Sequence, residues 1–287
     1  MAGESVGACS TCYHLLSNRP EMEAVRGAIL ISGTCLSPFG FSSNSSARAD
    51  AFAVGRKLGL ELDESSNHTS ATLLELFQSI PVSSLFRTAG TRYSPLKSDE
   101  GYVTAKWSPV FAEDFYPKEP MADSIDDGRF HKVPLLFGFN SEECLSPVFL
   151  KSLKHIKQKA KRWDQDTSKM LDITVNISDR SKAAEDIKTL YTNRSFSEDL
   201  AAVVKFCTDD EFTLPIARHA ESASEHGVPV YMYTMDYKFV PHFVPGVEGV
   251  GHAEDMFLYW DTTTTKLGES LLPNFGQSSN QILFLNT

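Results

Sequence analysis

Three short apolar runs predict buried strands, and the segments between them have the spacing of helices. The runs cover residues 28–33, 132–140 and 228–235. The first two are almost continuously apolar, as is typical of strands buried in a parallel sheet, and the third alternates and is rich in β-branched and aromatic residues. Strands separated by helical segments predict an α/β fold with a largely parallel sheet.

The predicted helices are defined by apolar residues that recur on one face. They cover residues 8–17, 47–59, 71–79, 147–163, 180–191 and 212–226. Residues 81–120 are rich in turn-forming residues and predict a loop with short elements, whereas residues 261–287 are polar and weakly patterned. The sequence has no internal repeat.

The helix predicted at 147–163 carries five lysines and Arg162 between its apolar residues. A basic amphipathic helix of this kind can lie on an acidic membrane. A packed helix with a solvated charged face has the same pattern and is much the commoner case, so we expect that arrangement here.

Composition and charge exclude several classes of protein. The 287 residues are 41% hydrophobic and 22% charged, which is ordinary for a globular chain with a sizeable core. The formal charge of -10 argues against nucleic acid as a partner. No window approaches 18 uninterrupted apolar residues, so we expect no membrane span, and residues 1–30 lack the pattern of a signal peptide.

Cysteines and glycosylation sequons bear on the compartment. The cysteines are Cys9, Cys12, Cys35, Cys144 and Cys207. They are odd in number and show no second C-x-x-C and no histidine at zinc spacing, so we expect no metal site and mostly free, buried thiols. Four N-glycosylation sequons stand at residues 44–46, 67–69, 176–178 and 193–195, which favours a secreted protein without fixing the compartment.

Residues Gly3 to Gly7 read Gly-Glu-Ser-Val-Gly, the Gly-x-Ser-x-Gly pattern of a nucleophile elbow. In an elbow the serine stands on a strained turn between a strand and a helix, and the following N–H, here that of Val6, faces the developing oxyanion. The flanking glycines allow strand and helix to approach closely. Taken alone the pattern favours an ordinary Gly/Ser loop, so other residues must support an elbow.

A serine nucleophile needs a histidine base and an acid that orients the base. In α/β-hydrolases these follow in the order serine, acid, histidine. The chain offers Ser5, then Glu142 and Glu143 after the second predicted strand, then His252 after the third. Groups at the carboxyl ends of parallel strands lie on one edge of the sheet, so this order permits a triad.

Several segments together resemble the second half of a type-B carboxylesterase of the cholinesterase-like group, and the His252 segment is similar to that of insect esterases. The resemblance runs from residue 1 to about 260, and its segments are 3–8, 14–17, 26–34, 130–143 and 249–255. It implies an α/β-hydrolase fold, incomplete here, with residues 1–287 forming part of one carboxylesterase domain. It also implies a small-molecule carboxylic ester as the substrate and no cofactor.

The resemblance also implies roles for single residues. Ser5 would be the nucleophile, His252 the base and Glu143 the acid, because the family places its acid sixth counting from the glycine, here Gly138. Glu142 is the alternative acid.

Three further residues match positions near the triad in that family. Ser32 would be a supporting hydroxyl and Asp209 its partner, although both could equally be turn or cap residues. Phe39 stands near the family's acyl pocket, although a lone aromatic residue is more often part of a core.

This sequence departs from the family pattern in three respects. Cys144 replaces the glycine after the acid, and Val6 replaces a smaller alanine. The family's first half, with its Gly-rich oxyanion loop and the strand that enters the elbow, has no counterpart in the 287 residues. We therefore expect that residues 1–2 do not form that strand and that this polypeptide alone is inactive. The rival to an esterase is a non-catalytic cholinesterase-like domain for adhesion or binding, a class that typically lacks a triad member.

Overall fold

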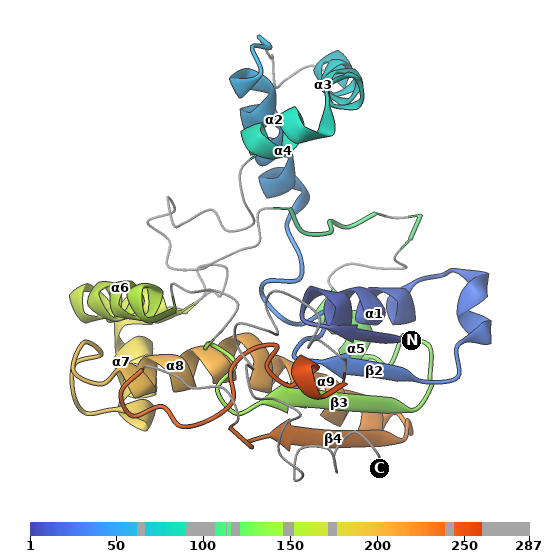
Figure 1. Ribbon diagram of the computed structural model, residues 1–287. Coiled ribbons are helices and arrows are strands. Elements are labelled where there is room, and N and C mark those ends of the chain that lie inside the picture. Colours follow the sequence, from blue (N-terminus) through green and yellow to red (C-terminus); the bar gives the residue numbers. More distant parts are fainter. Residues whose placement is uncertain are drawn as a thin grey trace, which may run out of the picture.

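A four-stranded parallel sheet forms the centre of the molecule (Figure 1). The computed structural model describes residues 1–61, 67–89, 107–112, 114–115, 121–145, 152–171, 177–238 and 244–259. The strands, in spatial order, are β1 (Ala2–Glu4), β2 (Ala28–Ile31), β3 (Leu135–Asn140) and β4 (Val230–Met235). Because all pairs are parallel, the carboxyl ends of the strands, and the loops that follow them, meet at one edge.

Three helices build the main core against one face of the sheet. These are α1 (Val6–Leu16), α5 (Met121–Asp126) and α9 (Leu214–Glu225). Leu30 of β2 and Phe137 of β3 are fully buried among apolar residues of these helices. Alternate residues of a strand face opposite sides, so these two strands direct one apolar row each into this core.

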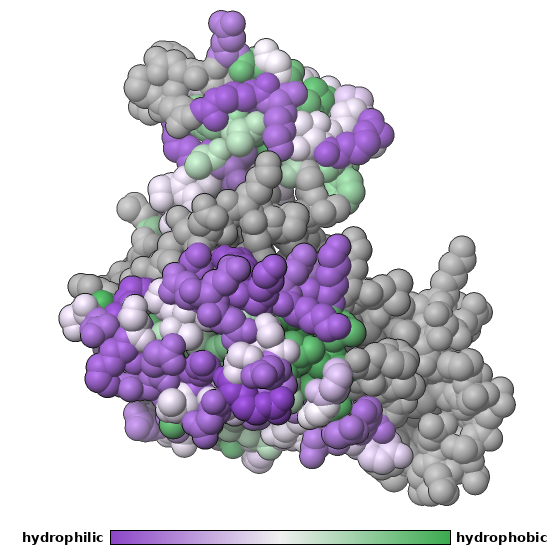
Figure 2. All heavy atoms as spheres, turned by 90° about the vertical axis from the view of Figure 1, so that its left-hand side faces the viewer, coloured by the Kyte–Doolittle hydropathy of each residue, from purple (hydrophilic) through white to green (hydrophobic). Residues whose placement is uncertain are grey.

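A second core lies beside the sheet, between α6 (Ser152–Gln165), α7 (Arg180–Tyr191) and α8 (Leu200–Thr208) (Figure 1). Trp163 packs with ring centroids 5.2 Å from Phe196 and 5.3 Å from Phe206. The lysines at 154, 157 and 161 are exposed, and Figure 2 shows a largely hydrophilic surface on this side. The apolar face of the basic helix is therefore used in protein packing, which confirms the solvated-face interpretation.

The remaining described helices are peripheral. The helices α2 (Asn44–Lys57), α3 (Asn67–Ser79) and α4 (Val82–Ala89) stand as a group away from the sheet (Figure 1). Short elements are η1 (Pro20–Ala24), η2 (Thr167–Met170), the π-helical turn η3 (Asp209–Thr213) and α10 (Met256–Tyr259). No helix within the described ranges has both the length and the apolarity needed to cross a bilayer.

The strand that enters the elbow corrects one expectation. We expected residues 1–2 not to form this strand, but Ala2 belongs to β1 and pairs with Ile29 of β2. The amide of Ile29 donates to the carbonyl oxygen of Met1 at 2.9 Å. Three residues pair here because β2 presents a complete row of backbone partners, which a reading of the short segment alone does not reveal.

The cysteines correct a second expectation, that most are free thiols. Cys12 is bonded to Cys35 and Cys144 to Cys207, with Cα–Cα distances of 5.4 and 5.9 Å, and Cys9 is free and buried. The partners are 23 and 63 residues apart, so their proximity arises from the packing of helices on strand-end loops and not from local spacing.

Most other expected elements agree within a few residues. Helix α7 has the predicted bounds, and α1 begins two residues before the predicted 8–17. Helix α8 was not predicted, because its run of alanine, valine and phenylalanine fits a strand equally well. The carboxylate of Asp199 accepts a hydrogen bond from the amide of Ala202 and so begins this helix. The predicted polar stretch 261–287 and most of the loop 81–120 lie outside the described residues.

Candidate active site

Three loops at the carboxyl edge of the sheet bring Ser5, His252 and Glu143 into one hydrogen-bonded chain. Nε2 of His252 lies 2.8 Å from Oγ of Ser5, and Nδ1 lies 2.7 Å from Oε2 of Glu143. The neighbouring Glu142 instead donates its backbone N–H to the carbonyl oxygen of Val250. Glu143 is thus the carboxylate that contacts the histidine, as the resemblance implied.

The backbone at Ser5 has the strained geometry of an elbow. Ser5 lies between β1 and α1 with φ 57° and ψ -123°, a region that non-glycine residues rarely adopt. A Cβ on Gly3 would lie 2.1 Å from the carbonyl oxygen of Gly7, and a Cβ on Gly33 would lie 2.6 Å from that of Ser5. A Cβ on Gly7 would meet nothing within 4 Å, so only Gly3 of the two flanking glycines is required by close approach.

The carboxylate of Glu143 is almost fully buried and held by two donors. Its Oε1 accepts from the backbone N–H of Asn140 at 2.7 Å and from Oγ of Ser32 at 2.5 Å. Ser32 therefore contacts the carboxylate of Glu143 directly, and its supporting role stays a prediction. The structure does not bring Asp209 to it: the carboxylate of Asp209 accepts from the hydroxyl of Tyr191 at 3.1 Å and lies 3.7 Å from Nζ of Lys205.

A buried polar link joins the acid loop to the histidine loop, and sequence reasoning missed it. Nδ2 of Asn140 donates to the carbonyl oxygen of Gly251 at 2.8 Å and to Oδ1 of Asp255 at 3.1 Å. Both side chains are fully buried. Buried amides and carboxylates are stable only when hydrogen-bonded, so this pair fixes the position of the His252 loop relative to β3. The polar asparagine that ends an apolar strand was the available signal.

Carboxylates surround the imidazole and change its protonation. Burial lowers the pKa of His252, but the hydrogen bond and charge of Glu143, with the charges of Glu4 and Asp255, raise that pKa to about 9. Oε1 of Glu4 lies 3.4 Å from Nε2 of His252. Burial raises the pKa of Glu4 to about 7 and that of Asp255 to about 6. The pocket therefore stabilises the imidazolium that forms when the serine proton moves to His252.

An aromatic wall lies beside the histidine. The ring of Phe212, on η3, is 5.1 Å from the ring of His252 and 5.0 Å from that of Phe39, measured between centroids. Phe39 thus reaches the site through Phe212, which was not identified from the sequence. Val6 is the first residue of α1, where N–H groups have no partner within the helix. Its N–H thus has the position that an oxyanion donor needs, and that role stays a prediction.

Two groups of side chains within the described ranges have metal-ligating atoms close together. They are Cys12, Cys35 and His219, and Cys144, Cys207 and Glu211. In each group both sulfurs form a disulfide, whereas a metal ligand is a thiolate. Nδ1 of His219 already lies 2.7 Å from Oγ1 of Thr34. Neither group therefore offers a ligand set while the disulfides are formed.

Comparison with known proteins identifies the family. The sequence profile of the carboxylesterase family matches residues 1–274. The chain is 28% identical over 268 residues to juvenile hormone esterase of Heliothis virescens, covering 89% of this chain and 45% of that protein. It is 26% identical over 247 residues to esterase S of Drosophila virilis, covering 82% and 44%. It is also 24% identical over 141 residues to cholinesterase 2 of Branchiostoma lanceolatum, covering 49% and 38%.

The first two relatives are insect esterases, in agreement with the resemblance of the His252 segment, and the chain spans less than half the length of each. A parallel sheet flanked by helices is the expected architecture for part of an α/β-hydrolase. The family profile matches almost the whole of these 287 residues, so this chain belongs to the carboxylesterase family.

Proposed function

We propose that the protein hydrolyses small carboxylic esters through an acyl-enzyme formed on Ser5. The observation that carries this is the continuous hydrogen-bonded chain from Oγ of Ser5 through His252 to Glu143. Nε2 of His252 accepts the hydroxyl proton while Oγ forms a bond to the carbonyl carbon. His252 then gives this proton to the leaving alcohol, and water, activated at the same nitrogen, releases the acid.

The supporting residues have separate tasks in this proposal. Glu143 keeps the proton of neutral His252 on Nδ1, which leaves Nε2 free to act as a base. Ser32 and Asn140 hold the carboxylate of Glu143 in place. The N–H of Val6 stabilises the oxyanion, and each such donor contributes on the order of 10²–10³ in kcat. With Val6 as the one donor assigned here, we expect the 287-residue polypeptide alone to turn over far more slowly than a full-length relative.

The test compares this polypeptide with a chimera in which the part of the Heliothis virescens esterase outside the matched region precedes residue 1. Release of nitrophenol from a short-chain ester and labelling by a fluorophosphonate are measured on both. We expect turnover from the chimera, and Ser5→Ala or His252→Ala should each lower its kcat about 10⁴-fold or more. Glu143→Gln should cost less, because nucleophile and base remain in place.

Glu142→Gln is the matched control, since Glu142 is the adjacent residue of the same type, whereas Glu143 is the carboxylate that contacts His252. Loss of activity in Glu142→Gln with none in Glu143→Gln would refute the assignment of the acid. A folded chimera whose Ser5 does not react with the fluorophosphonate would refute hydrolysis and favour the non-catalytic binding domain. Rapid turnover by the polypeptide alone would instead show that this chain builds an oxyanion site by itself.

A further inference from the structure

The sequon at residues 193–195 lies in a described, irregular loop between two helices. The loop joins α7 to α8 and begins with Thr192, and Asn193 is exposed. Asn44, of the sequon at 44–46, is the first residue of α2, and Asn176 lies outside the described residues. The side chain of Asn67 is likewise not described. Acceptor asparagines stand on surface loops, which distinguishes Asn193 from Asn44.

Hydrogen bonds within this loop fix its backbone and leave the carboxamide of Asn193 outside the network. Oγ1 of Thr192 donates to Asp199 at 2.9 Å and accepts from the N–H of Arg194 at 3.1 Å. The backbone amide of Phe196 donates to Asp164 at 2.6 Å, and its ring is fully buried in the second core. Within the described ranges no hydrogen bond from the side chain of Asn193 is found, so a substituent on its Nδ2 displaces nothing.

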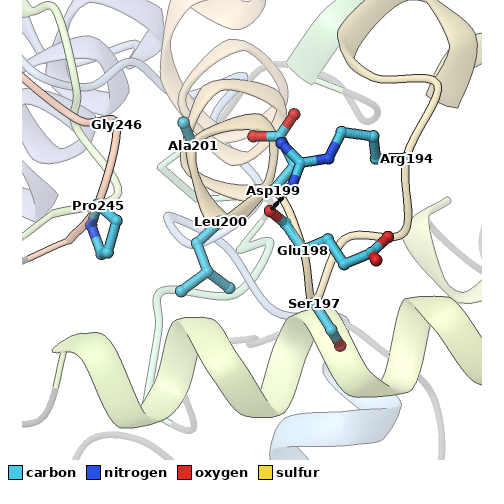
Figure 3. A pocket seen from close by; sticks show the side chains of 8 residues that line it. All are labelled: Arg194, Ser197, Glu198, Asp199, Leu200, Ala201, Pro245 and Gly246. Carbon is cyan, nitrogen blue, oxygen red and sulfur yellow. Dashed lines mark hydrogen bonds between the residues drawn. The ribbon is translucent and has the colours of Figure 1, made fainter.

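A hollow of about 320 Å³ adjoins this loop (Figure 3). Leu200 and Pro245 provide apolar surface, while Arg194, Ser197 and Glu198 provide polar groups around it. A sugar ring has the same two kinds of surface, an apolar face and a rim of hydroxyl groups. Arg194, the residue after Asn193, lines the hollow, so this mixed surface suits contact with a carbohydrate attached at Asn193.

The disulfides indicate independently that the chain matures where glycosylation occurs. Structural disulfides form in the secretory pathway and are rare in the cytosol. Four of the five cysteines are paired, and the pairs connect distant parts of the described fold. A sequon on an exposed loop and two disulfides thus point to the same compartment.

We infer that Asn193 is a site of N-linked glycosylation. The donor is an oligosaccharide carried on a polyprenyl diphosphate: Nδ2 of Asn193 forms a bond to C1 of the first sugar and loses a proton, and the bond from C1 to the diphosphate breaks. In the folded loop the hydroxyl of Ser195, which belongs to the sequon, donates to Glu198 at 2.7 Å. We therefore place the transfer of the sugar before the loop folds. The sequon loop and the acid loop lie at opposite ends of α8, because the sequon loop precedes Leu200 whereas Cys207, near the last residue of the helix, is bonded to Cys144 of the acid loop.

The experiment is glycopeptide mass spectrometry on the chain secreted from insect cells behind a heterologous signal peptide. Treatment with peptide N-glycosidase in heavy-oxygen water converts a modified asparagine to a labelled aspartate. We expect the label at residue 193 in the unaltered chain and in Ser195→Thr, which keeps the sequon. Asn193→Gln and Ser195→Ala should each lose this one glycan.

Urea unfolding of each secreted variant separates loss of the glycan from loss of the fold, because Asn193→Gln removes no hydrogen bond found in the structure. Secreted chain that carries glycans at other sequons but none at residue 193 would overturn the inference. An unmodified Asn193 in Ser195→Thr would overturn it as well. Neither result depends on ester hydrolysis, so this inference and the proposed function can fail separately.

Discussion

Asp255→Asn should stabilise the protein more at neutral pH than in acid. Asp255 is fully buried, and Nδ2 of Asn140 donates to its Oδ1 at 3.1 Å. An asparagine of the same shape retains an oxygen acceptor for this bond. The substitution therefore removes a buried negative charge, which is also one of the charges that raise the pKa of His252. Like charges make that charge costly, because Glu143 also raises the pKa of Asp255.

The magnitude follows from the shift of the Asp255 pKa. Burial raises it from 3.8 to about 6 in the folded protein. A carboxyl group whose pKa is raised on folding costs no stability below its unfolded pKa, and the cost grows as pH rises and is complete above the folded pKa. The two values give about 1 kcal/mol at pH 4.5 and about 3 kcal/mol at pH 8. Asp255→Asn should recover most of this, so the gain grows with pH.

Urea unfolding at pH 4.5, 6 and 8 measures the gain for Asp255→Asn. Asp236→Asn is the control, because Asp236 is exposed just after β4 and its replacement should change stability equally little at each pH. Equal gains for Asp255→Asn at pH 4.5 and pH 8, or a loss at pH 8, would refute the reasoning, since either would mean that the carboxylate is compensated in the folded state.

Three further predictions concern the imidazole, the disulfides and the aromatic wall. Glu4→Gln should lower the pKa of His252 from about 9, because one of the carboxylates that raise it is removed, so the pH midpoint of fluorophosphonate labelling should fall; an unchanged midpoint would contradict this. Cys144→Ser with Cys207→Ser should cost about 2–4 kcal/mol of stability in urea unfolding. Peptide maps without reduction should show two disulfides, and Cys9 should stay unalkylated in the folded protein because burial raises the pKa of its thiol to about 12. In the chimera, Phe212→Ala should change the kcat/KM ratio of long to short acyl esters by roughly 10–200-fold, whereas the exposed Phe86→Ala should leave it unchanged.

The strands and the triad could be predicted because both are encoded locally. A buried parallel strand is a continuous apolar run, and β2 and β3 were found on that basis, whereas β4 was found from its alternation and its β-branched and aromatic residues. The triad members follow a strand or lie in a recognisable segment, and a parallel sheet brings such segments to one edge. Three loops distant in sequence could therefore be predicted to meet without knowledge of the contacts between them.

Contacts between distant side chains could not be predicted in this way. The link between Asn140 and Asp255 joins residues 115 positions apart, and neither residue type indicates a partner. Asp209 shows the converse error: it was assigned to Ser32 from a family position, but the π-helical turn that follows α8 directs it to Tyr191. The prediction of free thiols was wrong for the same reason, since the pairing of cysteines depends on how helices pack and not on sequence spacing.

Backbone strain supplies evidence for the site that is independent of the sequence motif. Within the described ranges the non-glycine residues with positive φ are Ser5, Ser32 and Ala253. Each costs about 1–3 kcal/mol and persists only where its surroundings enforce it. All three lie beside the hydrogen-bonded chain of Ser5, His252 and Glu143: one is Ser5 itself, the proposed nucleophile, one donates to Glu143, and one follows His252. Strain in the loops that carry Ser5, His252 and the serine that donates to Glu143 is expected where side chains must be held for reaction, so the backbone favours an enzyme even without the Gly-x-Ser-x-Gly pattern.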